Sequence, residues 1–326
     1  MLLLSQEETR DALPFPELIE ALAEMFRKGC EMPVRHHHDM KVPDEPDATM
    51  LIMPAWVPGE HAGVKIVNVM PGNAAWGEPA ISAEYLLSDA RTGKMLALID
   101  GGELTARRTA AASALAASYL ARDDAEHLLV VGTGRLSSYL IEAHMAVRPI
   151  RKVSVWGRST EKAAGVAAKA AEQLGIDAEA VEDLDDAVSR ADIISAATLS
   201  NDPLIKGALL KPGAHVDLVG AFKPTMRESD DDAIRRSSVF VDTKDGCTKE
   251  GGDIVQPLES GVLKMTDIKA DLYDLTRGKH AGRSSDDEIT LFKSVGAALE
   301  DLAGAILAFQ STHDGDIDFG RADPEA

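Results

Sequence analysis

From residue 125 onward, short apolar runs alternate with helical stretches, and this alternation restricts the chain to few folds. Such a pattern is typical of βαβ units around a parallel sheet. Six runs would supply the two mononucleotide-binding halves of a doubly wound Rossmann domain. The six predicted strands are His127–Val131, Lys152–Trp156, Asp177–Val181, Asp192–Ala196, His215–Val219 and Val239–Val241.

The preceding residues mix helical and strand-like segments, which predicts an α+β region with largely antiparallel strands. Helices are expected at Phe15–Gly29 and Thr105–Ala121, and Ile289–Phe309 reads as one long apolar helix. The turn Arg91–Lys94 joins two apolar runs as a hairpin loop would. The predicted strands are Met50–Met53, Gly63–Val69, Tyr85–Ser88 and Met95–Ile99.

Composition excludes several classes of partner. The 54 acidic and 34 basic residues give a net charge of −20, which opposes binding to nucleic acid or to anionic membrane. The first residues lack a basic segment and a sustained apolar stretch, so neither a signal peptide nor a membrane span is expected. With only Cys30 and Cys247 present, no disulfide framework is indicated, and a cytoplasmic location fits.

A glycine-rich turn follows the first strand of the alternating region. Leu128–Val131 runs into Gly132, Thr133, Gly134, Arg135 and Leu136, and a helical stretch begins there. The first glycine permits a tight turn, the second lets the backbone approach phosphates, and the helix start offers free N–H groups. We therefore predict that Gly132–Leu136 binds a dinucleotide pyrophosphate. Ser137 occupies the position where a third glycine or alanine is usual.

The next strand indicates which dinucleotide is bound. In an NAD site an acidic residue at its end accepts hydrogen bonds from the ribose 2′-hydroxyl, but here the strand ends in Trp156-Gly157-Arg158-Ser159. A guanidinium and a hydroxyl suit a 2′-phosphate better. The predicted cofactor is NADPH, with NADH as the alternative. We also include Thr198, which follows the strand at 192–196, among the cofactor contacts.

The chain resembles the ornithine cyclodeaminase/mu-crystallin family in stretches spread over nearly its whole length. These are Gly63–Val69 with Pro71–Asn73, then Leu104–Ala111, and finally Leu291–Gly296. The resemblance implies two domains: a substrate-binding and dimerisation domain from 1–120 with 288–326, and a Rossmann NADP-binding domain from 121–287. It also implies a homodimer, with the active site between the domains.

By position, the resemblance assigns Arg35, Lys65 and Arg108 to the substrate carboxylate, with Lys65 and Arg108 as the catalytic pair. Guanidinium groups bind carboxylates with both charge and orientation, which suits a small amino or imino acid. The same resemblance implies that Thr109 contacts the pyrophosphate and that Ser294 lies on the nicotinamide side.

One departure from the family separates two reactions. Where the cyclodeaminases of the family carry an aspartate for the distal amine of ornithine, this chain has Phe222. A phenyl ring cannot pair with an ammonium as a carboxylate does, but it suits the methylene ring of a cyclic ketimine. The expected activity is reduction of Δ1-pyrroline-2-carboxylate or Δ1-piperideine-2-carboxylate to L-proline or L-pipecolate.

Three other functions stay open: an ornithine cyclodeaminase, which would release ammonia; an alanine dehydrogenase-like enzyme; and a non-catalytic NADPH-binding protein like the crystallins of the family. No metal is predicted. Adjacent side chains in His36-His37-His38 point in different directions in an extended chain, and no carboxylate-histidine spacing accompanies them.

Overall fold

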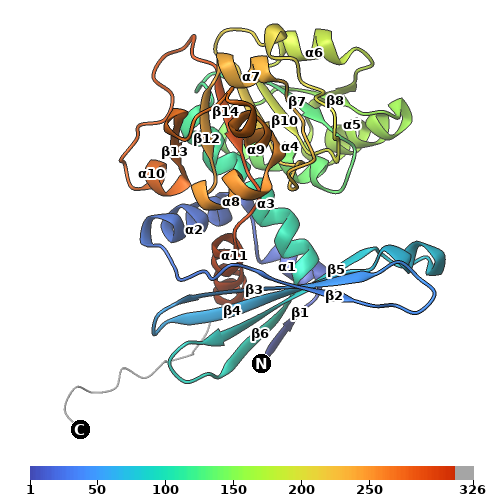
Figure 1. The fold of residues 1–326 in the computed structure, drawn as a ribbon, viewed down its shortest axis with the longest axis vertical. Coiled ribbons are helices and arrows are strands. Elements are labelled where there is room, and N and C mark those ends of the chain that lie inside the picture. The colour runs from blue at the N-terminus through green and yellow to red at the C-terminus, as the bar shows by residue number, and fades with distance from the viewer. Residues whose placement is uncertain (313–326) are drawn as a thin grey trace. The chain divides into compact units, whose positions relative to one another are not determined.

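The computed structural model describes residues 1–312, whose contacts form two compact units (Figure 1). The mixed-sheet unit contains Met1–Pro14, Glu31–Leu104 and the described residues from Asp301 onward. The parallel-sheet unit contains Phe15–Cys30 and Thr105–Glu300. The domain boundaries predicted from the sequence, after residues 120 and 287, stay a prediction. Residues 313–326, which that prediction placed in the first domain, lie outside the described chain.

The parallel-sheet unit is built on eight strands that all run in the same direction. Their order across the sheet is β13-β12-β14-β11-β10-β7-β8-β9. Their bounds are β7 (His127–Val131), β8 (Lys152–Trp156), β9 (Asp177–Ala180), β10 (Ile193–Ala196), β11 (His215–Leu218), β12 (Ser238–Val241), β13 (Ile268–Asp271) and β14 (Thr290–Lys293).

All six strands predicted in this region are present, and the predicted doubly wound α/β class is confirmed. The sequence did not reveal β13 and β14. The long helix predicted at Ile289–Phe309 is wrong in its first part, because Thr290–Lys293 pairs with both β11 and β12 inside the sheet. The backbone of Gly296, at φ +81°, separates this strand from the helix that follows.

Helices surround the parallel sheet, and α3 and α11 contribute residues to both units (Figure 1). The alanines of α3 are buried on every side of the helix, and their small side chains allow neighbouring segments to approach closely. The helices are α2 (Phe15–Lys28), α3 (Gly101–Leu120), α4 (Leu136–Val147), α5 (Thr160–Leu174), α6 (Leu184–Arg190), α7 (Asp231–Arg236), α8 (Lys244–Glu250), α9 (Gly252–Ser260), α10 (Leu272–Thr276) and α11 (Ala298–Ser311).

The order in which strands are added to the sheet reverses at β7. From β7 the chain passes through α4 to β8 on one side, whereas β10 pairs with the other side of β7. The loops that begin at Gly132 and Ala197 therefore leave neighbouring strands at the same carboxyl edge. Open α/β sheets bind ligands in the crevice that such a reversal creates.

The mixed-sheet unit has six strands in the order β1-β6-β5-β4-β3-β2. Strands β2 to β6 form an antiparallel meander, and β1 lies parallel to β6. Asp89 accepts hydrogen bonds from the Arg91 and Thr92 backbone, which confirms the predicted hairpin. Helix α1 (Gln6–Asp11) belongs to this unit, with the strands β1 (Leu2–Leu4), β2 (His36–Met40), β3 (Ala48–Val57), β4 (His61–Val69), β5 (Ile81–Asp89) and β6 (Met95–Asp100).

His36–His38 lie exposed on β2, at the edge of this sheet. Residues 1–312 contain no group of three or more His, Cys, Asp or Glu side chains arranged to hold a metal ion. Over the same residues, no helix combines the length and apolar character needed to cross a bilayer.

The parallel-sheet unit buries a histidine in a fixed tautomer. The Thr290 hydroxyl donates to the Leu120 carbonyl, so Nδ1 of His215, 2.9 Å from the Thr290 oxygen, must be the donor in that contact. Nε2 then carries the lone pair, and within residues 1–312 it has no hydrogen-bond partner. Burial lowers the pKa of His215 to about 3, because a second N–H would be buried without an acceptor.

The loss of folding stability at acid pH depends in part on His215. Between the folded pKa and the ordinary value, only the unfolded chain binds the proton, so stability is lost as the pH falls through this range. We expect the wild type to lose about 2 kcal/mol more than His215→Asn between about pH 7 and about pH 5. Chemical denaturation at both pH values measures the difference, and equal losses in the two proteins would contradict the prediction.

Candidate functional site

The loops after β7 and β8 need Gly132 and Gly157 for steric reasons. Gly132 has φ +126°, and a Cβ there would lie 2.8 Å from the Ala197 carbonyl oxygen of the neighbouring loop. A Cβ on Gly157 would lie 2.5 Å from the Thr133 methyl group. At Gly134, by contrast, no atom of residues 1–312 lies within 4 Å of the Cβ position, so this backbone is open to a ligand.

The helix that follows presents its N-terminus at this loop. Among the described residues, no side chain caps α4 at Arg135. The Ser137 hydroxyl, which is fully buried, donates to the Gly132 carbonyl at 2.9 Å. The hydroxyl at the third motif position therefore tightens the loop instead of disturbing it. An uncapped helix start beside an open glycine suits a pyrophosphate.

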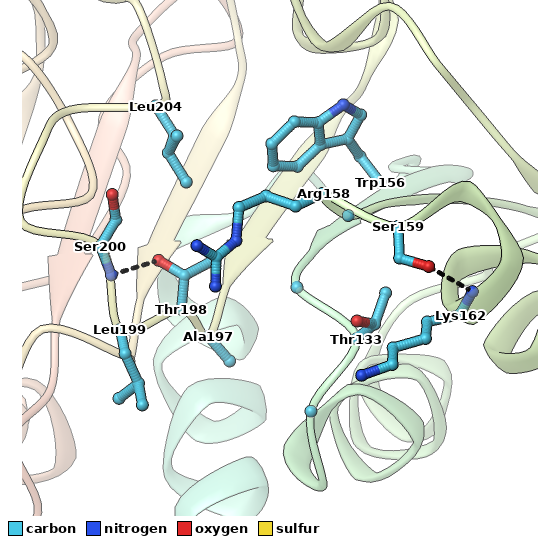
Figure 2. Close-up of a pocket in the computed structure, with 13 residues that line it drawn as sticks. Thr133, Trp156, Arg158, Ser159, Lys162, Ala197, Thr198, Leu199, Ser200 and Leu204 are labelled. Carbon is cyan, nitrogen blue, oxygen red and sulfur yellow. Dashed lines mark hydrogen bonds between the residues drawn. The ribbon is translucent and has the colours of Figure 1, made fainter.

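A cavity of about 340 Å³ lies at the carboxyl ends of β7, β8 and β10 (Figure 2). It is lined by residues of the loops after these strands and by the first turn of α5. Its shape and chemistry fit the adenosine end of a dinucleotide. The lining residues are Gly132, Thr133, Gly134, Trp156, Gly157, Arg158, Ser159, Lys162, Ala197, Thr198, Leu199, Ser200 and Leu204.

Two cations extend toward this cavity, from the end of β8 and from the first turn of α5 (Figure 2). Arg158 was predicted from the sequence, whereas Lys162 was missed. The Ser159 hydroxyl accepts a hydrogen bond from the Lys162 backbone N–H and so caps α5. The signal for the second cation was the place of Lys162 in the first turn of the helix that follows Arg158, where the helix N-terminus favours a bound phosphate.

The structure groups only some of the predicted cofactor residues. The cavity lining includes Gly132, Thr133, Gly134, Arg158, Ser159 and Thr198. The remaining four lie elsewhere in the parallel-sheet unit: Arg135 and Leu136 at the start of α4, Thr109 buried on α3, and Ser294 buried directly after β14. Their contacts with a cofactor stay a prediction.

Arg108 is buried on α3 and pairs with a carboxylate from α11. Its Nη1 donates to Oε2 of Glu300 at 2.5 Å, and the Glu300 side chain is fully buried. A Cβ on Gly296 would lie 2.5 Å from the same Nη1, so this glycine leaves the space that the guanidinium occupies. Asp242 accepts hydrogen bonds from the Val295 and Gly296 N–H groups and fixes this turn.

Lys65 is the corresponding cation of the mixed-sheet unit. It lies on β4, is 2% exposed, and its Nζ is 2.7 Å from Oδ2 of Asp301. Arg35, the third predicted cation, lies half-buried in the segment before β2. A buried cation held by a buried acid keeps a fixed position, which is what a substrate-orienting charge requires.

Sequence reasoning missed Glu300 and Asp301. Both acids are fully buried in α11, within the apolar stretch that begins at Ala298. Consecutive acids in an apolar helix carry a signal, because charged side chains are rarely buried without a partner. That signal points to buried cations but does not identify them.

Phe222 lies on the loop after β11, and 45% of its surface is exposed. The Lys223 ammonium lies 5.7 Å from its ring centre. Residues 220–226 contain no carboxylate, so this loop offers an apolar ring where the cyclodeaminases of the family are expected to carry an acid. Phe222 is absent from the lining of the described cavity.

Comparisons with known proteins show which family the chain is similar to. The model of the ornithine cyclodeaminase/mu-crystallin family matches residues 1–316. The Δ1-pyrroline-2-carboxylate reductase of Paracoccus denitrificans is 39% identical over 92% of this chain and 93% of its own length.

Two solved structures share the fold over 96% of this chain. Thermococcus litoralis Δ1-pyrroline-2-carboxylate reductase, in complex with NADH and L-proline, has a TM-score of 0.88, 34% identity and 97% coverage of its chain. An archaeal alanine dehydrogenase dimer with bound NAD has a TM-score of 0.86, 30% identity and 96% coverage of its chain.

The Arg108–Glu300 pair predicts a large stability effect. Glu300→Gln removes the negative charge that pairs with the buried Arg108 guanidinium, so we expect a loss of about 3 kcal/mol in the free energy of unfolding. As a matched control, Glu126→Gln breaks an exposed pair with Arg151 and should cost less than about 0.5 kcal/mol. Urea denaturation compares the two variants, and equal losses would contradict the prediction.

Proposed function

Because the chain belongs to the ornithine cyclodeaminase/mu-crystallin family, we propose that it reduces a cyclic ketimine carboxylate with NADPH. The products would be L-proline from Δ1-pyrroline-2-carboxylate and L-pipecolate from Δ1-piperideine-2-carboxylate. The observation that carries this choice is the exposed Phe222 within residues 220–226, a stretch without a carboxylate. Such a stretch can contact the methylene groups of a ring but has no acid to neutralise the distal ammonium of ornithine.

Lys65 and Arg108 are proposed to hold the substrate carboxylate, with Arg35 as a further contact. Their burial supports this role, because ionic contacts are strong where water is excluded. Each of the two buried cations is neutralised by its own acid, Asp301 or Glu300. Neither therefore adds a net charge that would oppose protonation of the imine nitrogen, and a protonated imine accepts hydride more readily.

The reduced nicotinamide, when bound, would supply the hydride to the imine carbon. The residues of this chain bind and orient the cofactor: the glycine loop and the α4 N-terminus at the pyrophosphate, and Arg158 at the 2′-phosphate. The proposed assembly is a homodimer that uses the mixed-sheet unit. An archaeal relative of the same fold is described as a dimer, which supports this part of the proposal.

A substrate panel tests the reaction. With NADPH and Δ1-pyrroline-2-carboxylate, we expect the absorbance of the reduced nicotinamide to fall and proline to appear in equal amount, because each reduced imine consumes one hydride. Arg108→Ala should lower kcat/KM by at least about a hundredfold, since a buried charge-assisted contact to the substrate would be lost.

Other outcomes of the panel would identify the alternatives. Ammonia release from ornithine without net cofactor turnover would indicate a cyclodeaminase. Turnover with pyruvate and ammonium would indicate an alanine dehydrogenase, an activity named for one structural relative. Cofactor binding without turnover of any of these substrates would favour a non-catalytic protein.

Cofactor choice is tested at Arg158. We expect Arg158→Ala to raise KM for NADPH by about 10- to 100-fold, because a charge-assisted hydrogen bond to the phosphate is lost. KM for NADH, which lacks this phosphate, should change little. Lys169→Ala, an exposed lysine on the same α5 helix, is the matched control and should leave both values unchanged. An equal effect of Arg158→Ala on both cofactors would contradict the proposed selectivity.

A further inference from the structure

A fully buried carboxylate links two of the loops at the carboxyl edge of the parallel sheet. Oε1 of Glu228 accepts from the Thr198 backbone N–H at 2.7 Å and from the Thr198 hydroxyl at 2.9 Å. Oε2 accepts from the backbone N–H groups of Gly220 at 2.8 Å and Ala221 at 3.2 Å. One side chain thus receives four donors from two segments that follow different strands.

These two segments carry separate parts of the proposed site. Thr198 follows β10 and lines the cofactor cavity. Gly220 and Ala221 follow β11 and directly precede Phe222. Glu228 is absent from the cavity lining, so any effect it has on a ligand must pass through these loops.

Two further buried charges hold Glu228 in place. Asp253, on α9, accepts from the backbone N–H groups of Glu228 and Ser229 at 2.9 and 3.0 Å. Lys293, at the end of β14, places its Nζ 3.3 Å from Oδ2 of Asp253 and 4.0 Å from Oε2 of Glu228. All three side chains have no exposed surface.

Two glycines allow the backbone to pack closely around Glu228, Asp253 and Lys293. A Cβ on Gly220 would lie 2.0 Å from the Thr198 carbonyl oxygen and 2.6 Å from Oε1 of Glu228. A Cβ on Gly252 would lie 1.9 Å from the Met226 carbonyl oxygen. The loops after β10 and β11 therefore touch through their backbones, and the carboxylate occupies the point where their N–H groups converge.

We propose that Glu228 is a positioning residue for the cofactor, whose ionised carboxylate fixes the Thr198 loop against the loop that carries Phe222. This inference rests on the proposed dinucleotide site but not on the identity of the substrate. The carboxylate form is required, because four donors converge on its two oxygens and only an acceptor can satisfy them all.

Protonation of Glu228 would loosen this arrangement. Burial raises the pKa of Glu228 to about 7, while the Lys293 ammonium opposes this rise and Asp253 adds to it. The groups facing the carboxylate are Lys293 from β14, Asp253 from α9, and the N–H and hydroxyl donors of the two loops. Cofactor affinity should therefore weaken as the pH falls through neutrality, because the neutral acid is the poorer acceptor.

Glu228→Gln tests the role while keeping the size of the side chain. If the amide oxygen accepts from Gly220 and Ala221, its NH2 group faces the Thr198 N–H, and that donor loses its acceptor. Calorimetric titration with NADP+ at about pH 8 should give a Kd about tenfold above that of the wild type. Between about pH 8 and about pH 6, the wild-type Kd should rise more than that of the variant.

Comparing the pH dependence of Kd between the wild type and Glu228→Gln cancels the contribution from protonation of the NADP+ phosphate. A phosphate monoester binds a proton near pH 6, and this contribution is the same for both proteins. Asp217→Asn is the matched control: Asp217 is a fully buried carboxylate on β11 that accepts from Ser113 and Ser195. This variant should lower Tm but keep the wild-type pH dependence of Kd.

A measurement on the wild type alone keeps the proposal testable if Glu228→Gln does not fold. Hydrogen exchange, corrected for intrinsic rates, should show that amide protection at Thr198, Gly220 and Ala221 falls between about pH 8 and about pH 6. Protection at Ile194 in β10, which reports on the core strand, should fall less than at these three amides. An equal change in protection at all four amides, or a Glu228→Gln variant with the wild-type Kd and pH dependence, would overturn the proposal.

The experiments can refute the proposed function and the positioning role of Glu228 independently of each other. If the wild type binds no nicotinamide dinucleotide, the proposed function is wrong, while the exchange measurement still tests whether Glu228 fixes the loops. If the wild type reduces ketimines but neither Kd nor exchange depends on Glu228, the function stands and the positioning role is wrong.

Discussion

Buried carboxylates fix the loops of the parallel-sheet unit in place, and each of them accepts several hydrogen bonds. Glu228 joins the segments after β10 and β11, and Asp242 fixes the turn after β14. A carboxylate can receive donors from different directions at one point, and its hydrogen bonds are strong where water is absent. Burying such a group is costly unless its partners are in place. The loops are therefore held in one arrangement at the edge where ligands are expected.

The strands were predictable where local sequence carries the signal. His127–Val131 and Lys152–Trp156 were predicted with the bounds that the structure gives, because short apolar runs between helical stretches are typical of parallel sheets. Thr290–Lys293 was mistaken for helix, since a fully buried strand and a buried helix segment have the same apolar appearance. Only its pairing with β11 and β12, far apart in the chain, makes it a strand.

In the candidate site too, residues with a local sequence signal were predictable and residues with distant partners were not. The glycine loop was predicted from the close backbone approach that only glycine allows, and Arg158 was predicted from its position at the end of a strand. Glu300 could not be assigned from the sequence, because its partner Arg108 lies 192 residues away and nothing local identifies the pair. An acidic residue in a sequence is usually read as solvated, so the burial of Glu228 was also invisible.

The adjacency of Glu300 and Asp301 makes α11 intolerant of changes in length. Successive residues of a helix point about 100° apart, so the two acids can serve Arg108 and Lys65 separately. Inserting or deleting one residue just before Glu300 would rotate both acids away from their cations and break two buried ion pairs at once. Among related sequences, α11 should tolerate substitutions of its apolar residues far more readily than insertions or deletions.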